Sequence, residues 1–261
     1  MNSFIPVTIF PIKAFKDNYI WAMMDPERKQ VFVVDPGEAV PVVRALKQHG
    51  CSLAGILLTH HHSDHSGGIE GLMQAAGQIP VIASHKSTIP EVNHPVKEGD
   101  HFDCLGIQLS VMEIPGHTLD HTAFYHDNQL VFCGDTLFSA GCGRVFEGTH
   151  NMMYDALCKL SSLKDETKIY CGHEYTLANL EFAKAVEPNN SAIQHKITQA
   201  KKLIDEIGCS LPSMMQDEKE FNPFLRCKEK EVIAASEKYM NKSLHSPVEV
   251  FSALRQWKNN F

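Results

Sequence analysis

The sequence predicts an α/β fold in which a layered domain is followed by a small helical domain. Up to about residue 175, short apolar runs alternate with turn residues and with helical stretches, which is typical of stacked sheets and helices. Beyond that point, β-branched runs become rarer and helical spacing dominates. The 261 residues, 43% of them hydrophobic, are enough for one large domain with an appendage. We therefore expect domains at 1–175 and 176–261.

Seven runs in the first part are predicted to be strands. Residues 30–35 (QVFVVD) end in an aspartate followed by Pro-Gly, and residues 54–60 (AGILLTH) end in a histidine. The other expected strands lie at 79–84, 107–114, 121–126, 129–135 and 168–173. Between the strands, helical spacing predicts helices at 39–49, 69–76 and 152–163.

The second part is predicted to be entirely helical. Apolar residues recur there at helical spacing, and no strand-like alternation interrupts them. The expected helices span residues 177–186, 191–207, 229–238 and 247–256.

Composition limits the kinds of partner and the cellular compartment that we expect for this chain. A formal net charge of −7 argues against nucleic acid as a partner, since basic residues would have to cluster to bind it. Eight cysteines without a C-x-x-C pair indicate reduced thiols and favour the cytoplasm. The N-terminus lacks the basic region of a signal peptide, and no apolar run approaches the roughly 20 residues of a membrane helix. We expect a cytoplasmic monomer with no membrane contact.

Histidines are unusually numerous, at 15, and several follow predicted strands. Four predicted strands lead directly into a potential metal ligand. The loops at strand ends can converge on one point, where a rigid scaffold holds functional side chains. Each of these residues has a plainer interpretation as a turn residue when taken alone, and their joint recurrence favours ligands. The four strand ends carry His60, His117, Asp135 and His173.

The densest group is the segment from Thr59 to Gly68, THHHSDHSGG. Alternate side chains of an extended segment point the same way, so His60 and His62 can reach one ion together. Asp64 and His65 follow on the turn and can face a second ion. Imidazole and carboxylate groups suit zinc, iron or manganese. His61 alternates to the other side and is expected to have a supporting role. A loop of solvated histidines is the alternative, but it is the default only for an isolated histidine.

These motifs resemble known ones. Thr59–Gly68 resembles the T-H-x-H-x-D-H-x-G-G signature of the metallo-β-lactamase superfamily. Over nearly its whole length the chain is similar to the glyoxalase II (hydroxyacylglutathione hydrolase) family. That narrower resemblance rests on the segments 17–19 (DNY), 133–138 (CGDTLF), 141–148 (GCGRVFEG), 171–176 (CGHEYT), 222–226 (NPFLR) and 254–258 (LRQWK).

The resemblance implies an αββα sandwich with a metal site at its edge, followed by a helical glutathione-binding domain. It implies two divalent metal ions per chain, with zinc preferred and iron or manganese as alternatives. The implied ligands of the first ion are His60, His62 and His117. The implied ligands of the second ion are Asp64, His65 and His173, and Asp135 bridges the two.

The implied reaction is hydrolysis of the thioester S-D-lactoylglutathione to D-lactate and glutathione, the second step of methylglyoxal detoxification. Two neighbouring cations lower the pKa of a shared water toward about 7, so the expected nucleophile is a hydroxide. Asp64 and Asp135 are the expected catalytic residues, with Asp64 orienting that hydroxide. The thiol pKa of glutathione, roughly 8–9, makes a general acid unnecessary for its departure. The substrate contacts implied by the resemblance are Arg144, Tyr175, Arg255 and Lys258.

Two positions depart from the family pattern. Phe146 stands where part of the family has tyrosine, so a hydroxyl contact to glutathione is absent there. Asp120 stands where the family usually has glycine, which suggests a turn with positive φ. Aspartate tolerates that conformation better than most residues, and the expectation is that Asp120→Gly would stabilise the fold.

Three other functions remain to be weighed. A persulfide dioxygenase of the same superfamily uses one iron and should lack the C-terminal extension with Arg255 and Lys258. A nucleic-acid-processing member would need a basic surface, against which the net charge argues. A binding module without catalytic metals would not need the full set of seven ligands.

Overall fold

A computed structural model describes residues 7–126 and 129–261, and its first six strands form one mixed sheet. β1 (Thr8–Ala14), β2 (Asn18–Asp25) and β3 (Gln30–Val34) are antiparallel. β4 (Ser52–Leu58), β5 (Val81–Ser84) and β6 (His94–Val96) continue the sheet in parallel. The parallel strands end at one edge of this sheet, and the loop after β4 carries the histidine-rich segment.

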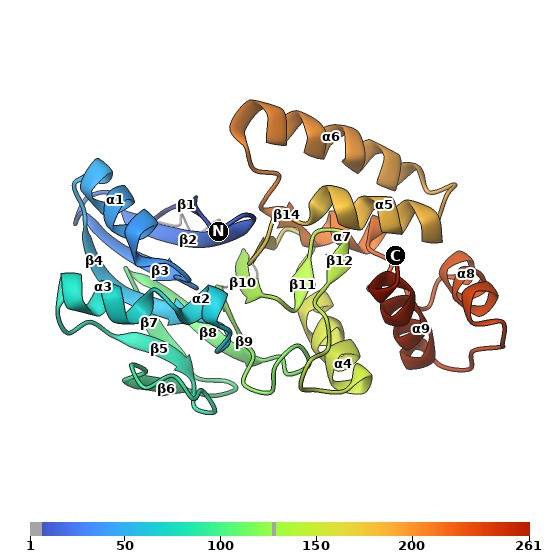
Figure 1. The fold of residues 1–261 in the computed structure, drawn as a ribbon, viewed down its shortest axis with the longest axis horizontal. Coiled ribbons are helices and arrows are strands. Elements are labelled where there is room, and N and C mark those ends of the chain that lie inside the picture. Colours follow the sequence, from blue (N-terminus) through green and yellow to red (C-terminus); the bar gives the residue numbers. More distant parts are fainter. Residues whose placement is uncertain (1–6, 127–128) are drawn as a thin grey trace. The chain divides into compact units, whose positions relative to one another are not determined.

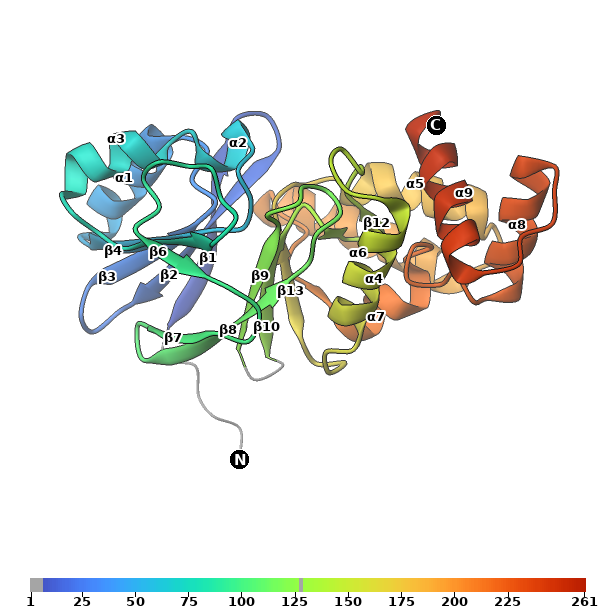
Figure 2. The same cartoon turned by 90° about the horizontal axis from the view of Figure 1, so that it is seen from below.

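Two helices cover one face of this sheet (Figure 2). They are α1 (Ala39–His49) and α3 (Ile69–Ala76). Val42 of α1 and Leu72 of α3 are buried in one hydrophobic cluster with Val33 and Ile56 of the sheet. α1 stops at Gly50, which adopts a left-handed conformation with φ of 62° and donates its N–H to the last turn. The helix therefore ends at a defined residue, and the chain turns there into β4.

A second group of antiparallel strands lies against the other face of the first sheet (Figure 2). It comprises β7 (His101–Cys104), β8 (Ile107–Glu113), β9 (Thr122–His126) and β10 (Leu130–Gly134), in the order β10-β9-β8-β7. Together with the first sheet these strands form the first compact unit, Met1–Glu113 with Asp120–Gly134. This unit thus supplies a helix layer and two sheet layers.

The second compact unit consists of Ile114–Leu119 and Asp135–Phe261. Its strands are short: β11 (Leu137–Phe138) pairs with β12 (Gly141–Cys142), and β13 (Lys168–Cys171) pairs with β14 (Ser213–Met214). Figure 1 shows α5 beside α6 and α8 beside α9. The helices are α4 (His150–Ser161), α5 (Thr176–Val186), α6 (Ser191–Ile207), α7 (Met215–Phe221), α8 (Lys230–Met240) and α9 (Pro247–Asn259).

The contacts group the chain differently from the expected boundary at residue 175. Residues 135–175 fall in the same unit as the C-terminal helices, because α4 packs against α9 and β12 packs against α5. Tyr154 of α4, for example, lies 6.1 Å from Phe251 of α9, measured between ring centroids. The division into domains at 1–175 and 176–261 stays a prediction.

Most of the expected elements are present. The helices predicted at 39–49, 69–76 and 191–207 have those bounds. The sequence did not predict the β1–β2 hairpin, the one-turn helix α2 (Ser63–Ser66) or α7. Across the described residues, no helix combines the length and apolar character that a membrane span requires. Each of the eight cysteines is a free thiol.

Candidate metal centre

Four predicted ligands come together directly after β4 in the first unit. The chain leaves the buried strand at Leu58 and runs through the histidines into α2, whose first turn carries Asp64. The ring centroid of His60 lies 4.8 Å from that of His62 and 4.3 Å from that of His65. The Oδ2 atom of Asp64 is 3.5 Å from His65 Nε2. His60, His62, Asp64 and His65 thus form one group.

Asp35, at the end of β3, orients two of these imidazoles. Its carboxylate accepts hydrogen bonds from the Thr59 amide and hydroxyl, both at 2.7 Å, and lies 3.2 Å from His65 Nδ1. Because the Thr59 hydroxyl donates to Asp35, it accepts from His60 Nδ1 at 3.0 Å. Both rings therefore carry their proton on Nδ1, which leaves the Nε2 lone pairs for a metal.

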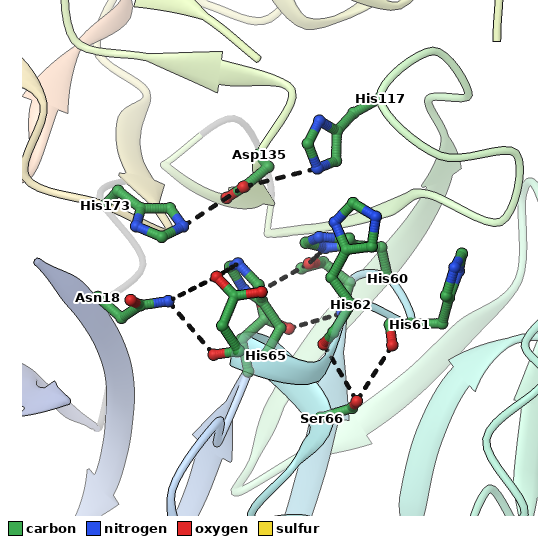
Figure 3. Close-up of polar contacts among 12 residues, drawn as sticks. Asn18, His60, His61, His62, His65, Ser66, His117, Asp135 and His173 are labelled. Carbon is green, nitrogen blue, oxygen red and sulfur yellow. Dashed lines mark hydrogen bonds and ion pairs between the residues drawn. The ribbon is translucent and has the colours of Figure 1, made fainter. Parts of the chain in front are cut away.

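Asp64 is also held in place by partners from distant parts of the sequence. Asn18, which is buried at the start of β2, donates from Nδ2 to the carboxylate of Asp64 at 3.0 Å and to its carbonyl at 3.2 Å (Figure 3). Gly37 approaches so closely that a Cβ there would lie 1.9 Å from the Asp64 carbonyl oxygen. Neither Asn18 nor Asp35 was assigned a role from the sequence, although the DNY motif and the strand-end aspartate were both visible.

His61 pairs with Asp120, while its ring lies 5.2 Å from that of His62, measured between centroids. The His61 Nδ1 atom is 2.9 Å from Asp120 Oδ1. Asp120 is not among the described residues with positive φ, so the expected reason for an aspartate here is wrong. Its carboxylate serves as a hydrogen-bond acceptor instead.

Three further predicted ligands meet in the second unit. Asp135 follows β10, His173 follows β13, and His117 lies in the loop after β8. The Oδ2 atom of Asp135 lies between two imidazoles, 3.6 Å from His117 Nε2 and 3.4 Å from His173 Nε2 (Figure 3). All three residues are buried. The arrangement brings one carboxylate and two imidazoles, all potential metal ligands, within reach of one another.

The donor atoms of this second group fit a cation. The His117 Nδ1 atom lies 2.8 Å from the carbonyl oxygen of Arg144, which can only accept, so Nδ1 carries the proton. The lone pair of His117 Nε2 then faces a carboxylate oxygen, and the two repel each other unless a cation lies between them. Nitrogen and carboxylate ligands without a thiolate suit zinc, iron or manganese.

All four predicted substrate contacts line one cavity of about 390 Å³ in the second unit, together with His117 and Asp135. They are Arg144, Tyr175, Arg255 and Lys258. The Tyr175 ring stacks on His173 with centroids 4.7 Å apart. The exposed ring of Phe146 lies 5.2 Å from the His117 ring, so this departure from the family pattern gives the cavity an apolar wall.

Two cations enter the cavity from α9. Arg255 is only 4% exposed; its Nη1 donates to the Cys142 carbonyl at 2.8 Å, and its guanidinium packs on the Phe224 ring at 5.1 Å. Its Nη2 has no hydrogen bond within the described residues. Lys258 donates to the Ala178 carbonyl at 3.0 Å, and burial together with the neighbouring Arg255 lowers its pKa to about 8. The paired cations make the cavity suited to an anion.

Comparisons with known proteins show the family of this chain. The model of the metallo-beta-lactamase superfamily matches residues 21–173, and the model described as the C-terminus of hydroxyacylglutathione hydrolase matches residues 174–261. A hydroxyacylglutathione hydrolase from Nitrosomonas europaea is 44% identical over 98% of this chain and 97% of its own length.

Two solved structures extend the comparison to the fold. The structure of ETHE1 from Myxococcus xanthus has a TM-score of 0.64 at 23% identity, covering 97% of this chain and 98% of that one. A protein crystallised in a di-iron-bound form has a TM-score of 0.52 at 28% identity, over 63% of this chain and 92% of its own. The predicted fold class, a metallo-β-lactamase fold with a helical C-terminal part, is confirmed.

Proposed function

The chain belongs to the hydroxyacylglutathione hydrolase family of the metallo-β-lactamase superfamily, and we propose that it hydrolyses S-D-lactoylglutathione to D-lactate and glutathione. The carrying observation is the cavity of the second unit, where Arg144, Arg255 and Lys258 lie beside the metal-ligand candidates His117 and Asp135. Glutathione brings carboxylates that these cations can bind, while its thioester reaches the ligands.

We further propose that two divalent cations bind each chain, with zinc preferred over iron or manganese. One would be held by His60, His62 and His117, the other by Asp64, His65 and His173, and both by Asp135. The fixed Nδ1 protons of His60, His65 and His117 and the position of Asp135 between two imidazoles support this assignment. When bound, such ions supply a nucleophilic water at neutral pH and neutralise charge on the carbonyl oxygen.

The chain's own residues then have distinct tasks. Asp64, whose carboxylate Asn18 holds at 3.0 Å, orients the attacking water. Arg255 and Lys258 bind the glutathione carboxylates, and Arg144 faces the same cavity with an exposed side chain. Tyr175 braces the His173 ring by stacking. The leaving thiolate is stable enough near neutral pH to depart without a general acid.

We keep as a proposal the division into a catalytic domain, residues 1–175, and a glutathione-binding domain, residues 176–261, with Arg144 as a substrate contact from the first. We propose a cytoplasmic monomer. The eight free thiols support the compartment, because a reducing environment keeps cysteines unpaired. A nucleic-acid or membrane partner is not part of the proposal.

The test is a hydrolysis assay on S-D-lactoylglutathione with elemental analysis of the same pure protein. We expect turnover with two metal ions per chain, and no oxygen consumption on glutathione persulfide. A fully metallated protein that consumes oxygen on the persulfide and leaves the thioester intact would overturn the proposal in favour of the dioxygenase.

A further inference from the structure

The short hairpin β11–β12, Leu137–Cys142, forms part of the cavity wall and is held from behind by two buried polar residues. These residues are Glu218 in α7 and Asn222 at the end of that helix, and both are fully buried. Neither lines the cavity, and neither belongs to the metal-ligand candidates. Their side chains nevertheless direct their polar atoms at the backbone of the hairpin.

The contacts are specific to the tip of the hairpin. Asn222 Nδ2 donates to the carbonyls of Phe138, at 3.1 Å, and Gly141, at 3.0 Å. Glu218 Oε2 accepts from the amide of Ala140 at 2.8 Å and lies 3.0 Å from Asn222 Nδ2, whose two hydrogens are shared among these three acceptors. Ala140 has φ of 57°, a left-handed conformation that is uncommon for a residue with a Cβ. Glu218 binds the amide of Ala140 itself, and Asn222 binds a carbonyl on either side of it.

Both ends of the hairpin lead to the candidate site. Asp135 lies two residues before β11, and a Cβ on Gly143 would lie 1.9 Å from the Asp135 carbonyl oxygen. After β12, the Arg144 carbonyl accepts from His117 Nδ1, and Arg255 binds the Cys142 carbonyl. A shift of the hairpin tip would therefore move Arg144 and the backbone that Arg255 contacts.

The carboxyl group at position 218 is fully buried, and its hydrogen bonds lie on the hairpin side. Burial raises the pKa of Glu218, while the hydrogen bonds from Ala140 and Asn222 and the charge of Lys196 oppose that rise. A buried carboxyl group costs free energy unless hydrogen bonds compensate it. The hydrogen bonds that Glu218 Oε2 accepts come from the hairpin amide of Ala140 and from Asn222, so this side chain couples α7 to the hairpin.

We infer that Glu218 and Asn222 are positioning residues for substrate recognition, which act by holding β11–β12 so that Arg144 and the Cys142–Gly143 backbone face the glutathione moiety. This inference rests on the proposed function. It concerns the binding of glutathione and leaves the chemistry of thioester cleavage to the metal-ligand group.

The experiment uses the metallated full-length chain with E218Q, E218A and N222A, and N190A as a matched control. Asn190 also donates to a backbone carbonyl of α7, that of Glu220 at 2.9 Å, and caps α6, but it does not touch the hairpin. Each variant is assayed on S-D-lactoylglutathione and on S-lactoyl-N-acetylcysteamine, which lacks the glutathione carboxylates. Hydrogen–deuterium exchange of residues 137–144 is measured alongside.

We expect N222A and E218A to raise KM for the glutathione thioester by about tenfold and to change kcat/KM for the small thioester by less than about twofold. E218Q keeps a carbonyl oxygen for Ala140 and should stay within about threefold of the wild type. Exchange at 137–144 should accelerate in N222A and not in N190A. If E218A does not fold, the KM and exchange measurements on N222A alone test the inference.

Equal losses on both thioesters, or an unchanged KM in folded N222A, would overturn the inference. A wild-type protein without activity on lactoylglutathione would instead overturn the proposed function. In that case only the exchange data test whether Glu218 and Asn222 hold the hairpin. Equal exchange rates at 137–144 in N222A and N190A would count against that role.

Discussion

His61 and Asp120, 59 positions apart in the sequence, are joined by a contact of 2.9 Å between Nδ1 and Oδ1. The Asp120 side chain is only 5% exposed, whereas the His61 side chain is 28% exposed. The contact ties the middle of the metal-ligand segment to the start of the chain leading into β9. An aspartate at this position therefore has a role that glycine could not provide.

This contact reverses the expected effect of restoring glycine. Asp120→Gly removes the acceptor of His61 and adds backbone freedom, so we expect the free energy of unfolding to fall by about 1–2 kcal/mol. Urea unfolding of the wild type, D120A, H61A and the double variant would isolate the pair in a double-mutant cycle. A coupling energy near zero, or a D120G variant more stable than the wild type, would contradict this account.

Lys258 predicts a pH dependence of substrate binding. Its pKa is lowered to about 8 by burial and by Arg255, so the ammonium is present below that pH and is lost as the pH rises through it. We expect KM for lactoylglutathione to rise above about pH 8 while kcat, measured with substrate bound, changes less. K258R, which stays charged, should flatten the KM profile. The same KM rise in K258R would assign the titration to another group.

Sequence patterns predicted the fold best where one face of an element is buried. The amphipathic helices α1 and α6 appeared with their bounds, because apolar residues recur there at helical spacing. The hairpin of β1 and β2 was missed for the opposite reason. β2 is buried on nearly every residue, so it shows no alternation, and Pro11 interrupts the apolar run of β1.

The residues of the candidate site likewise fall into those that the sequence predicted and those that it did not. Local spacing indicated His60 and His62, and recurrence at the ends of predicted strands indicated His117, Asp135 and His173. The supporting contacts could not be predicted: Asp35 reaches His65 across 30 positions, and Glu218 reaches Ala140 across 78. Such pairs depend on the tertiary fold: the strand-end position of Asp35 was visible in the sequence, but its contact with His65 was not.

Arg255 should differ from Lys258 when each is replaced by alanine. Arg255 is buried and donates to the Cys142 carbonyl, so R255A leaves a buried acceptor unsatisfied and should cost about 1–3 kcal/mol of stability. Both variants should lower kcat/KM on lactoylglutathione by roughly one to two powers of ten, mostly through KM. Urea unfolding beside kinetics would separate the effects. Equal stability of R255A and K258A would mean that Arg255 serves the substrate alone.

Among the proposed ligands, Asp135 should be the residue at which a conservative substitution lowers the number of bound metal ions most. Its Oδ2 atom lies between His117 Nε2 and His173 Nε2, so replacing one carboxylate oxygen with an amide weakens the ligand set of both proposed ions. We expect D135N to bind fewer than two ions per chain and to lose nearly all hydrolysis. D165N, which alters only a surface ion pair with Lys219, should keep both.

Metal removal tests the same relationship without a substitution. Chelation should abolish hydrolysis by the wild type, and zinc, iron or manganese should restore it, because nitrogen and carboxylate ligands accept each of these ions. The decisive quantity is the number of ions bound when activity is maximal. Maximal activity with one ion, or a D135N protein that retains two ions and full turnover, would contradict a carboxylate shared by two cations. The position of Asp135 between two imidazoles would then need a different explanation, with a single ion on one side of the carboxylate.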